Sequence, residues 1–120
     1  MDETLAIGDV ALVALPSSQP RGREQEGQRP AIVVGIPQGR VRFPMLLIAP
    51  LTSQEGEWVQ NNRVLYPTLE AGAGGLTRRS VVLLDQIRAI DARRLVAYLG
   101  SLTPAEYGVI APGLKQIFGF

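Results

Sequence analysis

Short apolar runs alternate with turn-forming segments along most of the chain, and this alternation restricts the fold more than any other feature. The runs cover residues 8–15, 30–36, 44–52, 63–71, 80–84 and 86–90. Each is rich in Val, Ile or Leu and too short for an average helix, which is typical of strands. Gly, Pro, Ser and charged residues fill the gaps at 17–28, 37–40 and 53–58. The pattern predicts a small barrel of antiparallel strands.

Prolines refine two of the expected strands. Pro30 suits the first residue of the strand at 30–36, where no ladder hydrogen bond is lost. Pro50 indicates a bulge or an edge near the end of the strand at 44–52.

Helices are expected only near the C-terminus. Asp91 can cap a helix over 92–99, and Gly100 occupies the position of a C′ glycine. Thr103, Pro104 and Glu106 form a capping-box pattern with proline at the first helical position, and Pro112-Gly113 should divide this last helix. The predicted fold is mainly β with C-terminal helices, in a single domain spanning residues 1–120.

The chain contains neither cysteine nor histidine, which narrows its chemistry. Disulfides, thiolate metal sites and the usual acid–base catalyst near neutral pH are excluded. No clustered Asp/Glu spacing suggests a carboxylate metal site, so neither a metal nor a cofactor is expected. The apolar stretch at 45–51 is far too short to span a bilayer, and no secretory signal is visible, so the expected location is cytoplasmic.

Arginine supplies eleven of the twelve basic residues, and three of the arginines fall close together. Arg21, Arg23 and Arg29 are interleaved with Glu24 and other polar residues, which fits either an anion site or a solvated, salt-bridged loop. Arg29 abuts an expected buried strand, where a guanidinium needs an anionic partner. Glu24, Glu26 or the phosphate of a ligand could fill that role.

Thr52 is the second candidate site residue, at the point where a strand gives way to a loop. Its hydroxyl could donate to a phosphate oxygen or orient a nucleophile. It could equally cap its own backbone.

The order of these landmarks resembles the MazF/PemK family of toxin ribonucleases. The first block consists of Gly8, Asp9, Gly22, Glu24, Gln25, Gly27, Arg29 and Pro30. The segment "IAPLTS", with Thr52, is similar to the family's strand that ends in threonine. The second block consists of Ser80, Asp85-Gln86, Arg88, Asp91 and Arg94-Leu95. The resemblance covers most of the chain, from about residue 8 to residue 120.

The resemblance implies a homodimer of SH3-like barrels that cleaves single-stranded RNA without a metal and is neutralised by an antitoxin. Carried over, the catalytic pair is Arg29 and Thr52, with Glu24 and Gln25 in the loop that shapes the site and Gln86 near the RNA. One position departs from the family, because Arg23 stands where a small hydroxyl residue is common. The further expected RNA contacts are Arg21, Arg23 and Arg79.

RNA carries its own nucleophile, so the implied reaction needs alignment, charge stabilisation and the transfer of two protons. Arg29 suits charge stabilisation, Thr52 suits alignment, and Glu24 is the best carboxylate for accepting the 2′-OH proton. Two alternatives stay open. One is a gyrase-poisoning toxin of the same barrel fold that acts through its C-terminal residues, and the other is a binding module that has lost catalysis.

Overall fold

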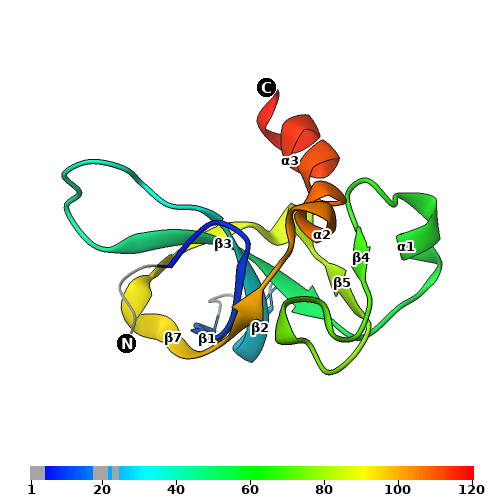
Figure 1. Ribbon diagram of the computed structural model, residues 1–120, viewed down its shortest axis with the longest axis horizontal. Helices are drawn as coiled ribbons and strands as arrows, with labels where there is room; N and C mark the ends of the chain where they lie inside the picture. Colours follow the sequence, from blue (N-terminus) through cyan, green and yellow to red (C-terminus); the bar gives the residue numbers. More distant parts are fainter. Residues whose placement is uncertain (1–4, 18–21, 23–24) are drawn as a thin grey trace.

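Within residues 5–17, 22 and 25–120, which the computed structural model describes, seven antiparallel strands curl into a half-barrel with helices at its C-terminal end (Figure 1). The strands are β1 (Asp9–Leu15), β2 (Gly27–Gly35), β3 (Met45–Thr52), β4 (Thr68–Leu69), β5 (Ser80–Val82), β6 (Arg88–Asp91) and β7 (Leu95–Ser101). The α-helices are α1 (Glu57–Asn61), α2 (Pro104–Gly108) and α3 (Ala111–Phe118), and the 3-10 turns are η1 (Ala73–Gly75), η2 (Leu84–Gln86) and η3 (Ala92–Arg94). The predicted fold class is confirmed.

β3 is the central strand, and it changes neighbours along its length. The sheet order is β4-β5-β3-β2-β1-β7, and β6 also pairs with β3. The first half of β3 pairs with β6, whereas Leu51 and Thr52 pair with β5. Pro50 stands at this change of partner, so its missing N–H interrupts neither ladder.

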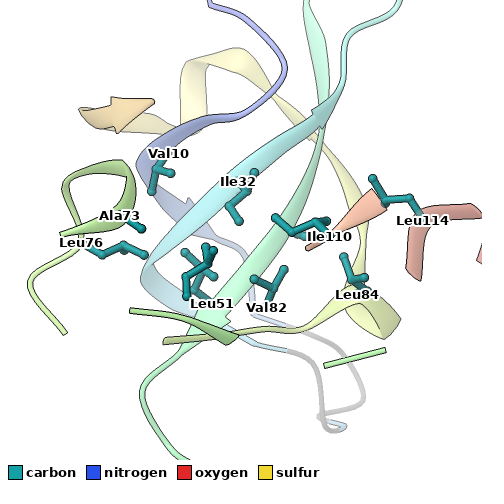
Figure 2. Close-up of a cluster of buried hydrophobic side chains, with 11 residues drawn as sticks. Val10, Ile32, Leu51, Ala73, Leu76, Val82, Leu84, Ile110 and Leu114 are labelled. Carbon is teal, nitrogen blue, oxygen red and sulfur yellow. The ribbon is translucent and has the colours of Figure 1, made fainter. Parts of the chain in front are cut away.

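Two apolar clusters lie on opposite faces of the sheet because side chains alternate along each strand. Val10, Ile32 and Leu51 belong to the first cluster, which Ile110 and Leu114 of the C-terminal segment complete (Figure 2). The neighbouring positions Val13, Val33 and Ile48 belong to the second cluster. The central strands are therefore buried on both faces.

The start of α2 matches the sequence prediction. The Thr103 hydroxyl accepts from the Glu106 N–H, the Glu106 carboxylate accepts from the Thr103 N–H, and Pro104 is the first helical residue. The predicted division of the last helix falls slightly earlier than expected. α2 ends at Gly108, and Pro112 lies in the first turn of α3.

The predicted helix over 92–99 is wrong. Asp91 does cap a turn, since its carboxylate accepts from the Arg93 N–H, but the turn is only η3. The chain then enters β7, because the open edge of β1 offers an antiparallel partner that local propensity does not reveal. Gly100 is consequently a packing glycine, since a Cβ there would lie 2.7 Å from the Gly74 backbone of η1.

Three further expectations need correction. The loop predicted at 53–58 runs into α1, and the strand predicted at 63–71 shrinks to β4, which follows Pro67. β2 begins at Gly27 instead of Pro30. Pro30 lies inside the strand, opposite Leu12 of β1 and one residue before the β2–β3 ladder begins at Ala31.

Candidate functional site

An open pocket of about 290 Å³ lies where β2 begins and β3 ends. Its polar lining includes Gln25, Arg29, Thr52, Ser53, Arg78 and Ser80. The sheet register explains this meeting. Ala31 pairs with Pro50, so extending the antiparallel register by two residues places Arg29 opposite Thr52. Opposed residues of two antiparallel strands lie on the same face of the sheet.

The Arg29 side chain forms a hydrogen bond through one nitrogen, and its other nitrogens are available to a ligand. Its Nε donates to the Glu26 carbonyl oxygen at 3.0 Å, and the side chain is exposed. Among the described residues, no carboxylate lies within ion-pairing distance of its guanidinium. The backbone contact restrains the side chain, and the terminal nitrogens are left to bind an anion in the pocket.

The Thr52 hydroxyl is oriented by its own loop. Its Oγ1 accepts from the Gln54 N–H at 3.2 Å, which is the local turn that such a residue commonly forms. That bond uses the oxygen only as an acceptor, so the hydroxyl hydrogen can still be donated to a ligand.

Arg78 and Ser80 were not among the predicted site residues, yet both line the pocket. The Ser80 hydroxyl donates to the Arg78 carbonyl at 3.0 Å, which fixes the turn leading into β5. Arg78 thus brings a second cation beside Arg29. The signal in the sequence was the adjacent pair Arg78-Arg79, but only the fold shows which of the two faces the pocket.

Arg79, the predicted RNA contact of that pair, interacts elsewhere. Its Nε lies 3.0 Å from Glu55 and its Nη1 lies 3.2 Å from Glu70. Both carboxylates are partly exposed, so these ion pairs contribute little to stability. They nevertheless hold the Arg79 guanidinium, and Arg79 is not among the residues that line the pocket.

Gln86 and Arg88 hold the end of the loop that precedes β2. The Gln86 Oε1 accepts from the Gln25 N–H at 2.8 Å, and the Arg88 Nη1 donates to the Gln25 carbonyl at 3.5 Å. The Gln25 Oε1 is buried at the pocket and has no hydrogen-bond partner in the described part of the chain. Gln86 therefore positions Gln25 through the backbone.

Three predicted site residues, Glu24, Arg21 and Arg23, lie outside the described residues. Within the described ranges, no group of three or more His, Cys, Asp or Glu side chains could hold a metal ion. No helix there is long and apolar enough to cross a bilayer.

Trp58 and Tyr66 form a packing unit beside the site. Their rings meet edge to face at 4.9 Å between centroids, and Tyr66 packs on the small cluster of Val59, Val81 and Leu83. The Tyr66 hydroxyl donates to the Asp85 carboxylate at 2.7 Å. This hydrogen bond, with burial and the carboxylate charge as smaller causes, raises the pKa of Tyr66.

The family comparison matches almost the whole chain. Residues 6–118 match the model of the PemK-like, MazF-like toxins of type II toxin–antitoxin systems. Among solved structures, MazF from Deinococcus radiodurans superposes with a TM-score of 0.72 at 23% identity, covering 99% of this chain and 100% of that one.

Two similar structures are complexes. An endoribonuclease bound to its cognate antitoxin, from a mycobacterial species, gives a TM-score of 0.68 at 20% identity, covering 99% of this chain and 97% of that one. A MazE–MazF structure from Deinococcus radiodurans gives 0.64 at 25% identity, covering 99% of each chain.

Proposed function

The chain belongs to the PemK-like, MazF-like toxins of type II toxin–antitoxin systems, and from that premise we propose that it is a sequence-selective endoribonuclease. Its substrate is single-stranded RNA. The observation that carries the proposal is the meeting of Arg29 and Thr52 in one open pocket, with no described carboxylate paired to the Arg29 guanidinium.

The reaction uses the nucleophile of the RNA itself. The 2′-oxygen attacks the adjacent phosphorus, the bond from phosphorus to the 5′-oxygen breaks, and the products are a 2′,3′-cyclic phosphate and a 5′-hydroxyl. Because no water has to be activated, the reaction needs positioned charge and two proton transfers.

Arg29 stabilises the charge that develops on the phosphate. Its terminal nitrogens can grip two non-bridging oxygens, and Arg78 adds a second cation at the same pocket. Thr52 donates its hydroxyl hydrogen to a phosphate oxygen and so aligns the linkage. The proton lost by the 2′-OH passes to a carboxylate, for which Glu24 is the candidate, and the 5′-oxygen receives a proton from Arg29.

Two kinds of protein partner are proposed, an antitoxin and a second copy of this chain. Solved relatives include an endoribonuclease with its cognate antitoxin and a MazE–MazF complex, so we propose an antitoxin partner here. An acidic antitoxin segment would compete with RNA, because the arginines that bind phosphate also attract carboxylates. We also propose a cytoplasmic homodimer. Its support is the edge strand β7, which exposes Val96, Tyr98 and Leu99.

The test is incubation of the purified protein with a long single-stranded RNA in excess chelator. Discrete fragments ending in 2′,3′-cyclic phosphate are expected, and added antitoxin should suppress them. Intact RNA would contradict the proposal.

One observation favours a second candidate, the gyrase-poisoning toxin. The C-terminal side chains Ile117, Phe118 and Phe120 are exposed instead of closing the core, and the two Phe rings stack at 6.5 Å. If the RNA stays intact, inhibition of gyrase in a supercoiling assay would identify this activity.

A further inference from the structure

The hairpin that joins β2 to β3 exposes a basic and aromatic tip that the pocket does not use. Residues 36–44 stand away from the body of the sheet as the cyan-to-teal loop in Figure 1. Arg40, Val41, Arg42 and Phe43 are all exposed, and Phe43 retains 55% of its accessible surface. None of the four belongs to an apolar cluster of the described chain, so the fold does not account for them.

The charge at this tip is uncompensated. No acidic residue occurs in the sequence between Glu26 and Glu55. Among the described residues, neither Arg40 nor Arg42 forms an ion pair. The Arg42 guanidinium lies over the Phe43 ring, 5.0 Å from its centroid, which restrains both side chains.

The neighbouring turn adds to the positive charge. The Ala92 N–H donates to the Pro44 carbonyl at 2.7 Å, so η3 lies against the base of the hairpin. The Asp91 carboxylate accepts hydrogen bonds from the Arg93 Nε at 3.2 Å and from the Arg93 Nη2 at 3.0 Å. Arg94 is exposed, and no described carboxylate pairs with it.

The tip lies at the opposite end of β2 from the pocket. β2 leaves the pocket near Arg29 and reaches the hairpin after Gly35, and the six residue steps between these two positions span about 20 Å at the usual rise per residue. A ligand that contacts both places must therefore be long and extended.

We propose that the hairpin tip is a second contact site for single-stranded RNA, used by the strand whose scissile linkage lies in the pocket. This inference rests on the ribonuclease function proposed above. A base stacks on the face of Phe43 that Arg42 leaves open, while Arg40 and Arg42 contact the flanking phosphates. An acidic peptide would satisfy the arginines but would leave the aromatic ring without a partner, so RNA fits the observations better.

The test compares two labelled RNAs of about 5 and about 25 nucleotides, one near the lower end of the usual single-strand site size of about 4–16 nucleotides and one well above its upper end. Both carry a 2′-deoxy nucleotide at the scissile linkage so that binding can be measured without cleavage. Fluorescence anisotropy is recorded for the wild type, for the triple variant R40A/R42A/F43A and for Lys115→Ala, which removes a positive charge from α3.

The triple variant should bind the long RNA at least tenfold more weakly and the short RNA unchanged. The slope of log affinity against log salt should fall by about 1.4 for two lost phosphate contacts on the long RNA. Lys115→Ala should match the wild type. Equal binding of the long RNA by the triple variant, or equal weakening on both RNAs, would overturn the inference.

Two further outcomes would assign the tip to a protein partner and equally overturn the inference. In the first, light scattering shows that the triple variant is a monomer. In the second, the triple variant no longer binds the antitoxin but still binds RNA as the wild type does.

The two proposals can fail separately. Hairpin-dependent binding without cleavage of unmodified RNA would contradict only the ribonuclease function, whereas cleavage with no effect of the hairpin would contradict only the second site.

Discussion

The side-chain oxygen of Gln86 accepts a hydrogen bond from the backbone N–H of Gln25 at 2.8 Å, across 61 positions of sequence. This contact ties η2 to the end of the loop that leads into β2 and Arg29. It makes Gln86 a positioning residue for the pocket.

Gln86→Leu should lower both stability and cleavage. Loss of the acceptor leaves a partly buried N–H unpaired, which costs about 1 kcal/mol or more, and a displaced Gln25 should slow cleavage about tenfold. Gln86→Glu keeps an acceptor and should retain most of the activity. Urea unfolding and single-turnover cleavage measure the two effects. A Gln86→Glu variant that is impaired while Gln86→Leu is normal would indicate direct contact with the RNA.

Thr52→Val should slow cleavage about a hundredfold with little loss of stability, because it removes one donor to the reacting phosphate and keeps the shape of the side chain. Thr52→Ser should stay close to the wild type, since the hydroxyl remains. Rates under single-turnover conditions separate this effect from product release. If Thr52→Val cleaves as fast as Thr52→Ser, the hydroxyl serves only the turn to Gln54.

Local signals in the sequence were sufficient for the cap at Thr103 and for most strands of the core. They failed at 92–99, where Leu95 and its neighbours suit a helix locally and the edge of β1 decides otherwise. Non-local pairing of this kind leaves no periodic trace in a short segment.

Non-local pairing also limits how much of the candidate site can be predicted from the sequence. Arg29 could be chosen from the residues because it adjoins a buried strand, but its pairing with Thr52 came only from the family resemblance. The β2–β3 register that opposes these residues is a property of the folded sheet. Arg78 and Arg79 are equivalent candidates for an RNA contact in the sequence, and only the fold shows that Arg78 lines the pocket.

Alanine substitutions at Gly113 and Gly108 should have opposite effects on stability. A Cβ at Gly113 would collide with the Leu84 side chain and the Val64 carbonyl, so Gly113→Ala should cost about 1–3 kcal/mol. A Cβ at Gly108 meets nothing within 4 Å, and Gly108→Ala should add about 0.5 kcal/mol by restricting the unfolded chain. Urea unfolding compares them. Equal effects would mean that Gly113 of α3 does not lie against Leu84 of η2.

Stability should fall on the alkaline side because of Tyr66. The hydrogen bond to Asp85 raises the pKa of Tyr66 above its ordinary value of 10.0, so the unfolded chain loses this proton first. Stability is therefore unchanged below about pH 10 and decreases as the pH rises through the folded pKa. Burial also raises the pKa of Tyr107, which contributes in the same direction.

Tyr66→Phe should lessen this alkaline loss, since it removes the titrating group. The check is urea unfolding of both proteins between about pH 8 and pH 11. Parallel stability curves for the wild type and Tyr66→Phe would assign the alkaline loss to other groups.

The role of Arg29 is tested most directly by the rate at which 2′,3′-cyclic phosphate ends form on single-stranded RNA in excess chelator under single-turnover conditions. Arg29→Ala should reduce this rate about a thousandfold, and Arg29→Lys should recover only part of it, because an ammonium cannot grip two oxygens. Lys115→Ala, which also removes one positive charge, should cleave like the wild type. Cleavage by Arg29→Ala at the wild-type rate would contradict the proposal that this guanidinium stabilises the reacting phosphate.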